Sequence, residues 1–211
     1  MIELVLVRHG NTFAPGDRIV WVGSGQDLPL VESGRAQARA FAKTLEAAGW
    51  QPTAALSGGL KRQAEHLDIA TAGTPSQETH RALDEVDYGS WGGRTTDEIV
   101  AEHGDEAVRA WNERSEWPQD AGWPESLAEV RDRVAHFAAE VAAGAHGGRV
   151  LVCSSNGLLR WFLGLVPGAL ESAIEGASFK VKTGHVGKMV WEASTGWRVV
   201  SWNQPPTAPL S

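Results

Sequence analysis

An arginine and a histidine stand side by side near the start of the chain, in the tripeptide Arg8-His9-Gly10. A neutral imidazole nitrogen is a competent nucleophile toward phosphorus. The adjacent guanidinium offers a planar fork of donors that matches phosphate oxygens, and Gly10 lets the backbone approach a bound group closely. The tripeptide therefore indicates phosphoryl transfer, although a structural histidine beside a surface arginine is the commoner meaning of so short a motif.

Longer motifs extend this pattern over nearly the whole chain. LVRHGNT, at residues 6–12, resembles the start of the histidine phosphatase superfamily, which includes the cofactor-dependent phosphoglycerate mutases. Further stretches resemble motifs of that family in the same order, namely DLPLVESGRAQA at 27–38, SGGLKR at 57–62, LDEVDYGSWGG at 83–93 and WPESLAEVRDRV at 123–134. The resemblance implies a phosphoglycerate mutase-like fold and an enzyme that transfers phosphate through a histidine.

The resemblance also assigns roles to particular residues. His9 matches the nucleophile that becomes phosphohistidine, and Arg8 and Arg62 match the arginines that bind the phosphate. Glu85 lies four residues before Gly89, as the family's proton donor does. These roles agree with the chemistry, because the transferring phosphoryl group needs positive charge around its oxygens and the leaving alkoxide needs a proton. Such a scheme requires no metal ion or other cofactor.

One position of the expected phosphate site departs from the family pattern. In VCSSNGLLR, Ser155 stands where the family has a second histidine that donates to the transferring phosphoryl group, and Asn156 stands where a glycine follows. Losing one such donor costs on the order of 100- to 1000-fold in rate. Ser155, Asn156, a water molecule and His185 are the candidates to fill the gap. Asn11 and Thr12 match the loop that lines the phosphate and the leaving group.

Short apolar runs alternate with amphipathic segments along the chain, which is typical of an α/β protein. We predict a three-layer α/β/α sandwich with a mostly parallel sheet. Strands are expected over 2–7, 53–57 and 149–154, helices over 34–48, 60–72, 95–111, 126–143 and 156–165, and strands again after residue 179, one of them antiparallel. Ser33 is expected to cap the first helix, and Thr95–Glu98 and Ser126–Glu129 are expected to form capping boxes.

The site should lie at the carboxyl ends of the strands, where RHGNT and SSNG follow two buried runs. We expect one domain over 1–211 with a cap-like insertion around 88–125. Trp111, Trp117 and Trp123 fall in a polar stretch with proline and glycine, which predicts a loop. Aromatic residues on such a loop are candidates for a substrate wall or cover, and they favour an apolar or aromatic leaving group.

Composition limits the possible partners. The net charge of −7 argues against a nucleic-acid binder, which needs a basic face. The single cysteine, Cys153, allows no internal disulfide, and no signal peptide or membrane span is recognisable. No histidine has metal-ligand spacing to cysteine or carboxylates. We therefore expect a cytoplasmic protein that acts on a small-molecule phosphate ester without metal, and a homodimer stays open.

Several functions fit these residues. A phosphomonoester hydrolase with reduced activity is favoured over a phosphomutase, because no extra basic cluster is present in 94–125. A weakly active or non-catalytic phosphate-ester binder is the second alternative, and Ser155 motivates it. A serine hydrolase built on Cys153–Gly157, with Glu175 and His185, is the least favoured, because it leaves Arg62 and Glu85 without a role.

Overall fold

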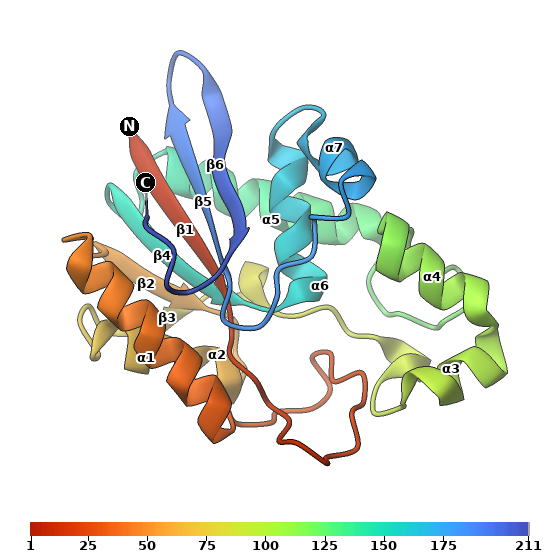
Figure 1. Ribbon diagram of the computed structural model, residues 1–211. Helices are drawn as coiled ribbons and strands as arrows, with labels where there is room; N and C mark the ends of the chain where they lie inside the picture. Colours follow the sequence, from red (N-terminus) through yellow and green to blue (C-terminus); the bar gives the residue numbers. More distant parts are fainter. Residues whose placement is uncertain (211) are drawn as a thin grey trace.

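The apolar run at the N-terminus becomes an inner strand of a six-stranded sheet in the computed structural model, which describes residues 1–210. The strand order is β3-β2-β4-β1-β5-β6 (Figure 1). Parallel pairing joins β1 (Ile2–Arg8), β2 (Ala54–Ser57), β3 (Gln77–Thr79) and β4 (Arg149–Ser154), and antiparallel pairing adds β5 (Val186–Glu192) and β6 (Gly196–Gln204). The sheet is therefore mostly parallel, as predicted.

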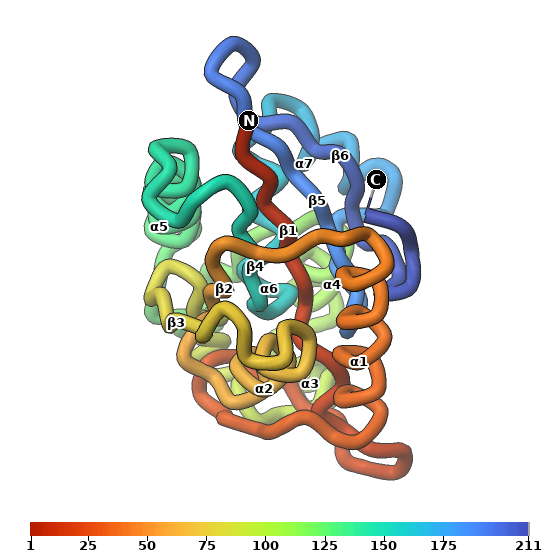
Figure 2. Tube along the Cα trace, turned by 90° about the vertical axis from the view of Figure 1, so that its left-hand side faces the viewer, coloured from red at the N-terminus to blue at the C-terminus, as the bar shows by residue number. Residues whose placement is uncertain are grey.

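Helices cover both faces of this sheet (Figure 1). They are α1 (Glu32–Ala47), α2 (Lys61–Thr71), α3 (Thr96–His103), α4 (Asp105–Arg114), α5 (Leu127–Ala142), α6 (Asn156–Leu159) and α7 (Ala169–Glu175), with 3-10 turns at Arg81–Leu83, Gly89–Trp91 and Arg160–Leu165. Alternate residues of β1 point to opposite faces. Val5 and Val7 pack in a core with Phe41 of α1 and Leu67 of α2, and Figure 2 shows these two helices from the side.

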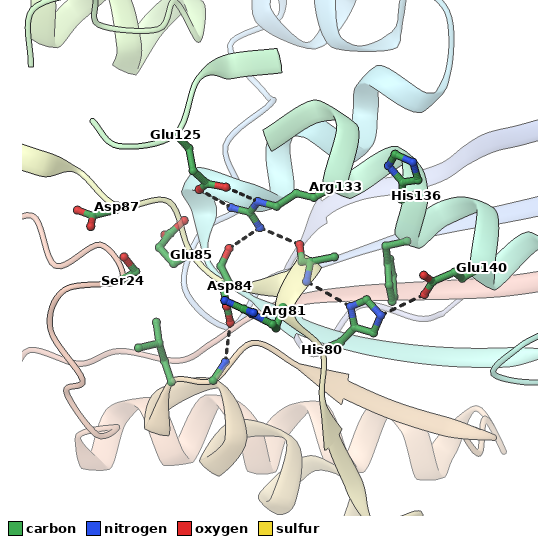
Figure 3. A pocket seen from close by; sticks show the side chains of 14 residues that line it. Ser24, His80, Arg81, Asp84, Glu85, Asp87, Glu125, Arg133, His136 and Glu140 are labelled. Atoms are coloured by element: carbon green, nitrogen blue, oxygen red, sulfur yellow. Dashed lines mark hydrogen bonds and ion pairs between the residues drawn. The ribbon is translucent and has the colours of Figure 1, made fainter. Parts of the chain in front are cut away.

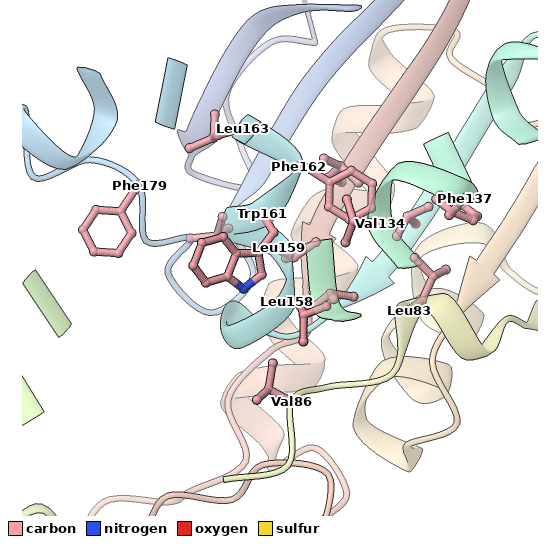
Figure 4. Packing of buried hydrophobic residues seen from close by; sticks show 14 of the residues in the cluster. Leu83, Val86, Val134, Phe137, Leu158, Leu159, Trp161, Phe162, Leu163 and Phe179 are labelled. Atoms are coloured by element: carbon pink, nitrogen blue, oxygen red, sulfur yellow. The ribbon is translucent and has the colours of Figure 1, made fainter. Parts of the chain in front are cut away.

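The opposite face carries the larger core. Leu4 and Leu6 of β1 share it with Val134 and Phe137 of α5 and with Phe162. Figure 4 shows the side chains of the last three residues within this core. Because each side of the sheet buries its own helices, the molecule has the three-layer α/β/α architecture that the sequence predicted.

Several local predictions need correction. Ser33 does not cap α1, because the helix begins two residues earlier than expected, at Glu32, and its N-cap is Val31. The helix expected over 95–111 is split at Gly104, whose φ of 83° ends α3 and starts α4. Both capping boxes are present, whereas β3 and α7 were not expected. No helix of the described residues 1–210 combines the length and the apolar character that crossing a membrane demands.

The tryptophan-bearing stretch within 88–125 is packed rather than open. Trp111 lies on α4 and is 1% exposed, which corrects its assignment to a loop. Its ring centroid lies 4.9 Å from that of Trp123, which in turn lies 4.8 Å from that of Trp117. All three belong to or pack against the larger core, which α5 covers. The segment is therefore joined to the body of the molecule by an aromatic cluster.

Candidate active site

The phosphate motif begins where β1 ends beside β4. Arg8 lies opposite Ser154 in the parallel pairing, and the amide of His9 donates to the carbonyl oxygen of Ser154 at 3.1 Å. The segments 9–12 and 155–157 therefore leave the sheet at the same edge. Ligands of open parallel sheets bind outside this edge, as the sequence predicted here.

The imidazole of His9 is buried and held by both nitrogens. Nδ1 lies 2.8 Å from the carbonyl oxygen of Gly10 and donates to it, while Nε2 accepts from Nε of Arg62 at 3.2 Å. Burial, together with Arg8 and Arg62, holds the pKa of His9 well below its ordinary value. The ring is therefore neutral with a lone pair on Nε2, which is the form that a nucleophile toward phosphorus needs.

The two phosphate-site arginines are fixed by backbone carbonyls. Arg62, in the first turn of α2, donates from Nη1 to the carbonyl of Gln26 at 2.8 Å and from Nη2 to that of Gly23 at 2.7 Å. Arg8 donates from Nη1 to the carbonyl of Val181 at 2.9 Å. Because carbonyls fix the planes without neutralising the charge, both guanidinium groups stay free to compensate a bound anion.

The carboxyl group of Glu85 sits against the start of α6. Oε2 accepts from the amide of Gly157 at 3.3 Å, and Oε1 accepts from the amide of Val86 at 2.8 Å. A Cβ atom at Gly157 would lie 2.5 Å from Oε1 of Glu85 and 2.6 Å from the hydroxyl of Tyr88. The close approach that Gly157 permits thus positions Glu85 in the site.

Asn11, Thr12 and Asn156 line the same cavity as His9, where the sequence predicted them. The amide of Asn11 donates to Oε1 of Gln37 at 2.9 Å. Oδ1 of Asn156 accepts from the amide of Val181 at 3.0 Å. These bonds tie the loop after β1 and the start of α6 to neighbouring segments.

Ser155 and His185 do not line this cavity. Ser155 is 1% exposed, and its Oγ accepts from Nε2 of Gln63 at 3.0 Å. Nδ1 of His185 lies 2.9 Å from the carbonyl oxygen of Asn203. In this structure the Ser155 hydroxyl is therefore engaged by Gln63 and the His185 ring by the backbone, and contact of either with substrate stays a prediction.

The cavity around His9 has a volume of about 540 Å³. One end is polar and holds Arg8, His9, Arg62 and Glu85. Apolar side chains form much of the remaining wall, namely Phe13, Ile19, Val20, Trp21, Val22 and Trp111. Of the three tryptophans proposed as a substrate wall, only Trp111 lines the cavity, because Trp117 and Trp123 pack behind it.

Sequence reasoning missed several lining residues, among them Trp21 and Lys180. The apolar run Ile19–Val22 lies between charged and glycine-containing segments, and that contrast is a signal that could have identified it. Lys180 stands between α7 and β5, outside every recognised motif, and its Nζ donates to Oδ1 of Asn112 at 3.0 Å. Only the folded chain brings Lys180 to the cavity.

A second cavity, of about 710 Å³, lies on the other side of Glu85 and also includes Arg133 and His80 (Figure 3). Arg133 forms an ion pair with Glu125 at 3.0 Å, and its Nη1 donates to the carbonyl of Asp84 at 2.8 Å. The helix α5, which carries Arg133, thereby holds the backbone segment that leads into Glu85.

The same region gathers His80, Glu140 and His146 within 4.8 Å of one another, a cluster that sequence spacing did not reveal. Nε2 of His80 lies 3.1 Å from a carboxylate oxygen of Glu140, and its Nδ1 accepts from the amide of Ala82 at 3.2 Å. His80 thus uses both ring nitrogens in hydrogen bonds that hold the turn before Glu85.

The fold agrees with the comparisons to known proteins. The family model described as the histidine phosphatase superfamily (branch 1) matches residues 4–205. The chain therefore belongs to the histidine phosphatase superfamily.

Relatives within the superfamily carry different activities. A 2,3-bisphosphoglycerate-dependent phosphoglycerate mutase of Brucella ovis is 32% identical over 172 residues, which cover 74% of this chain and 82% of the mutase. A mutase of the same name from Maricaulis maris is 34% identical over 125 residues, 56% of this chain and only 49% of that protein. A mycobacterial glucosyl-3-phosphoglycerate phosphatase, solved with inorganic phosphate, is 27% identical with a TM-score of 0.76, covering 99% of this chain and 100% of that one.

Proposed function

We propose that the protein hydrolyses small-molecule phosphomonoesters through a phosphohistidine at His9. The observation that carries the proposal is the unprotonated Nε2 of His9, held beside Arg62 in a cavity that Arg8 and Glu85 also line. Membership of the superfamily and the likeness to a phosphatase of known structure support the same reading.

In the first step, Nε2 of His9 attacks phosphorus and the bond between phosphorus and the ester oxygen breaks. Arg8 and Arg62 stabilise the charge on the phosphoryl oxygens, and the carboxyl group of Glu85 gives its proton to the leaving alkoxide. In the second step, water attacks phosphorus while the carboxylate of Glu85 takes its proton. The bond between phosphorus and Nε2 then breaks, which releases phosphate and restores neutral His9.

The proposed scheme assigns charge neutralisation to guanidinium groups rather than to a metal ion. Arg8 and Arg62 supply two fixed positive charges at the reacting phosphate, the task that Mg²⁺ performs in many phosphoryl-transfer enzymes. We expect exhaustive dialysis against EDTA to leave the hydrolysis rate unchanged. A rate that falls on dialysis and returns with a divalent cation would contradict this part of the proposal.

The decisive experiment compares His9→Ala with the unaltered protein on p-nitrophenyl phosphate. We expect His9→Ala to abolish hydrolysis, and rapid quenching of the unaltered protein under alkaline conditions to yield a phosphopeptide containing His9 by mass spectrometry. His136→Ala, at an exposed position of α5, is the control and should retain activity. Equal activity of His9→Ala and the unaltered protein would refute the proposal.

Two alternatives follow from specific observations. The buried Ser155, which reaches Gln63 instead of the cavity, favours a binder of phosphate esters with little turnover. The mutase relatives favour a phosphomutase. Tight binding of phosphate or vanadate without turnover on a broad panel of esters would support the binder. Transfer of labelled phosphate from His9 to a second alcohol, faster than to water, would support the mutase.

A further inference from the structure

Four cationic residues surround the cavity, and only one carboxylate faces it. Arg8, Arg62 and Lys180 line the cavity, and Arg160 lies directly behind Trp111 of its wall. Glu85 is the one acidic residue among the lining residues. Within residues 1–210, none of the four cations forms an ion pair with a carboxylate. The site therefore holds more positive charge than a single phosphate dianion requires.

The excess positive charge lies away from the end of the cavity that holds Arg8, His9 and Arg62. Nζ of Lys180 donates a hydrogen bond to Oδ1 of Asn112 at 3.0 Å, and this ammonium group forms no other hydrogen bond within residues 1–210. Because an ammonium group has three donors, two stay available to a ligand. Asn112 lies on α4, next to Trp111, so Lys180 faces the cavity beside its aromatic wall.

Arg160 reinforces this charge from behind the wall. Its side chain is fully buried, and its guanidinium carbon lies 3.9 Å from the ring centroid of Trp111 and 5.1 Å from that of Phe179. Nη1 donates to the carbonyl of Trp111 at 3.0 Å, while the buried Nη2 has no partner within residues 1–210. Burying a cation without a carboxylate partner costs free energy. A nearby anion would therefore be stabilised by the charge of Arg160.

Apolar side chains lie between the two charged regions. Trp21 and Trp111 present aromatic surface to the cavity, and Ile19, Val20 and Val22 add aliphatic surface. Such a wall accommodates a flat or apolar molecular body, whereas a small polar alcohol would leave it in contact with water.

We propose that Lys180 determines specificity by binding a second anionic group, a carboxylate or phosphate, carried by the alcohol portion of the substrate on an apolar or aromatic body. The inference rests on the proposed function, because it requires the ester phosphate to bind at Arg8, His9 and Arg62 first. The substrate class is therefore a phosphate ester with two separated negative groups.

The test uses non-hydrolysable ligands, so that binding is measured without turnover. Phenylphosphonates with a carboxylate at the meta or para position are compared with their carboxamide counterparts by calorimetric titration. Each pair has the same shape and differs in one charge. The variants are Lys180→Met and, as the control, Lys182→Met, because Lys182 is exposed and does not line the cavity. Circular dichroism checks that both variants are folded.

We expect the unaltered protein and Lys182→Met to bind one carboxylate ligand about 10- to 100-fold more tightly than its carboxamide, as a charge-assisted hydrogen bond provides. Lys180→Met should bind both members of the pair equally. Equal preference in Lys180→Met and the unaltered protein, or no carboxylate preference in the unaltered protein, would overturn the inference. Binding of the parent phenylphosphonate, which has no second anionic group, and the hydrolysis rate of His9→Ala test the proposed function separately.

The pH dependence provides a second readout. Burial, together with Arg160 and Arg8, lowers the pKa of Lys180 to about 8, while Glu113 opposes the shift. The carboxylate preference of the unaltered protein should therefore decline as the pH rises through about 8. Lys180→Arg keeps its charge and should keep the preference to higher pH. A decline that is the same in both proteins would count against Lys180 as the binding group.

Discussion

Gly157 allows the carboxyl group of Glu85 and the hydroxyl of Tyr88 to approach the backbone of α6. A methyl group there would lie 2.5 Å from Oε1 of Glu85 and 2.6 Å from the hydroxyl oxygen of Tyr88. We expect Gly157→Ala to displace Glu85 and to lower kcat on p-nitrophenyl phosphate by at least about tenfold, since the general acid contributes roughly 100- to 10,000-fold. Gly164→Ala, where an added Cβ meets no atom within 4 Å, should retain kcat. Retained kcat in Gly157→Ala would contradict this role of the glycine.

Ser155 and Gln63 form a buried pair where the superfamily resemblance implies a histidine. Oγ of Ser155 accepts from Nε2 of Gln63 at 3.0 Å, and Gln63 is fully buried. Because an imidazole is larger than the serine side chain, which already touches Gln63, we expect it to crowd Gln63. We expect Ser155→His alone to destabilise the protein, by about 1–3 kcal/mol for overpacking. Adding Gln63→Ala should restore stability, because the imidazole then has room, and a kcat above that of Gln63→Ala would show that the new ring reaches the phosphoryl group.

The measurements for this pair are urea unfolding and steady-state hydrolysis of p-nitrophenyl phosphate. Gln63→Ala alone is the control, because it creates space without adding a donor. A stable double variant whose kcat equals that of Gln63→Ala would show that position 155 does not reach the phosphoryl group.

At the scale of elements, α2 supports the loop after β1 through His66. Nδ1 of His66 accepts from the amide of Gly10 at 3.1 Å, next to His9. Burial lowers the pKa of His66 to about 3, below the ordinary value of about 6.5 in an unfolded chain. The folded protein therefore keeps His66 neutral, whereas the unfolded chain takes up a proton as the pH falls below about 6.5.

This difference predicts how stability depends on pH. The stabilisation is fully present above about pH 6.5 and is lost progressively as the pH falls toward about 3, because the unfolded state binds more protons. At pH 5.5, His66 should account for about 1.4 kcal/mol of lost unfolding free energy relative to pH 7.5. Urea unfolding of His66→Gln at the two pH values should show a correspondingly smaller difference. An unchanged difference would refute the linkage.

The elements that were predictable are those with a local signal. β1 and β4 contain the apolar runs Leu4–Val7 and Val150–Cys153, and the two capping boxes mark α3 and α5. The edge strand β3 has only three residues, of which two are exposed, so it lacks the hydrophobic pattern on which such predictions depend. The break at Gly104 was hidden for a related reason, since helical periodicity continues on both sides of it.

The residues of the candidate site also fall into a predictable group and an unpredictable group. His9, Arg62 and Glu85 were predictable because they lie in motifs of the superfamily. Lys180 and the Gln63–Ser155 bond were not, because each depends on side chains that only the tertiary fold brings together. The contact of Ser155 with substrate was predicted from its place in the sequence motif, and that place does not determine the hydrogen bond to Gln63 that the structure shows.

At the scale of the whole molecule, the segment 88–125 shares its aromatic residues with the body of the protein. The ring centroids of Trp111 and Trp117 lie 6.2 and 6.4 Å from that of Trp161, which is outside the segment, and Trp123 is buried in the same core. We expect the segment to unfold together with the sheet. Trp123→Ala should therefore shift one cooperative urea transition, with a loss of about 3–5 kcal/mol.

The measurement is urea unfolding followed by both tryptophan fluorescence and far-ultraviolet circular dichroism. Val200→Ala, at a partly exposed position of β6, is the control and should leave the transition nearly unchanged. Two separate transitions in the unaltered protein, one by each probe, would show instead that 88–125 unfolds as an independent unit.

The pairing of Gln63 with Ser155 has a consequence for how this sequence can change over generations. A mutation of Ser155 to histidine crowds Gln63, and a mutation of Gln63 to a smaller residue leaves the buried hydroxyl of Ser155 without its donor. Each single-step route to a two-histidine site therefore passes through a less stable intermediate. Selection for stability therefore acts against both single mutations. Selection for faster catalysis is expected to act instead on other positions around the cavity.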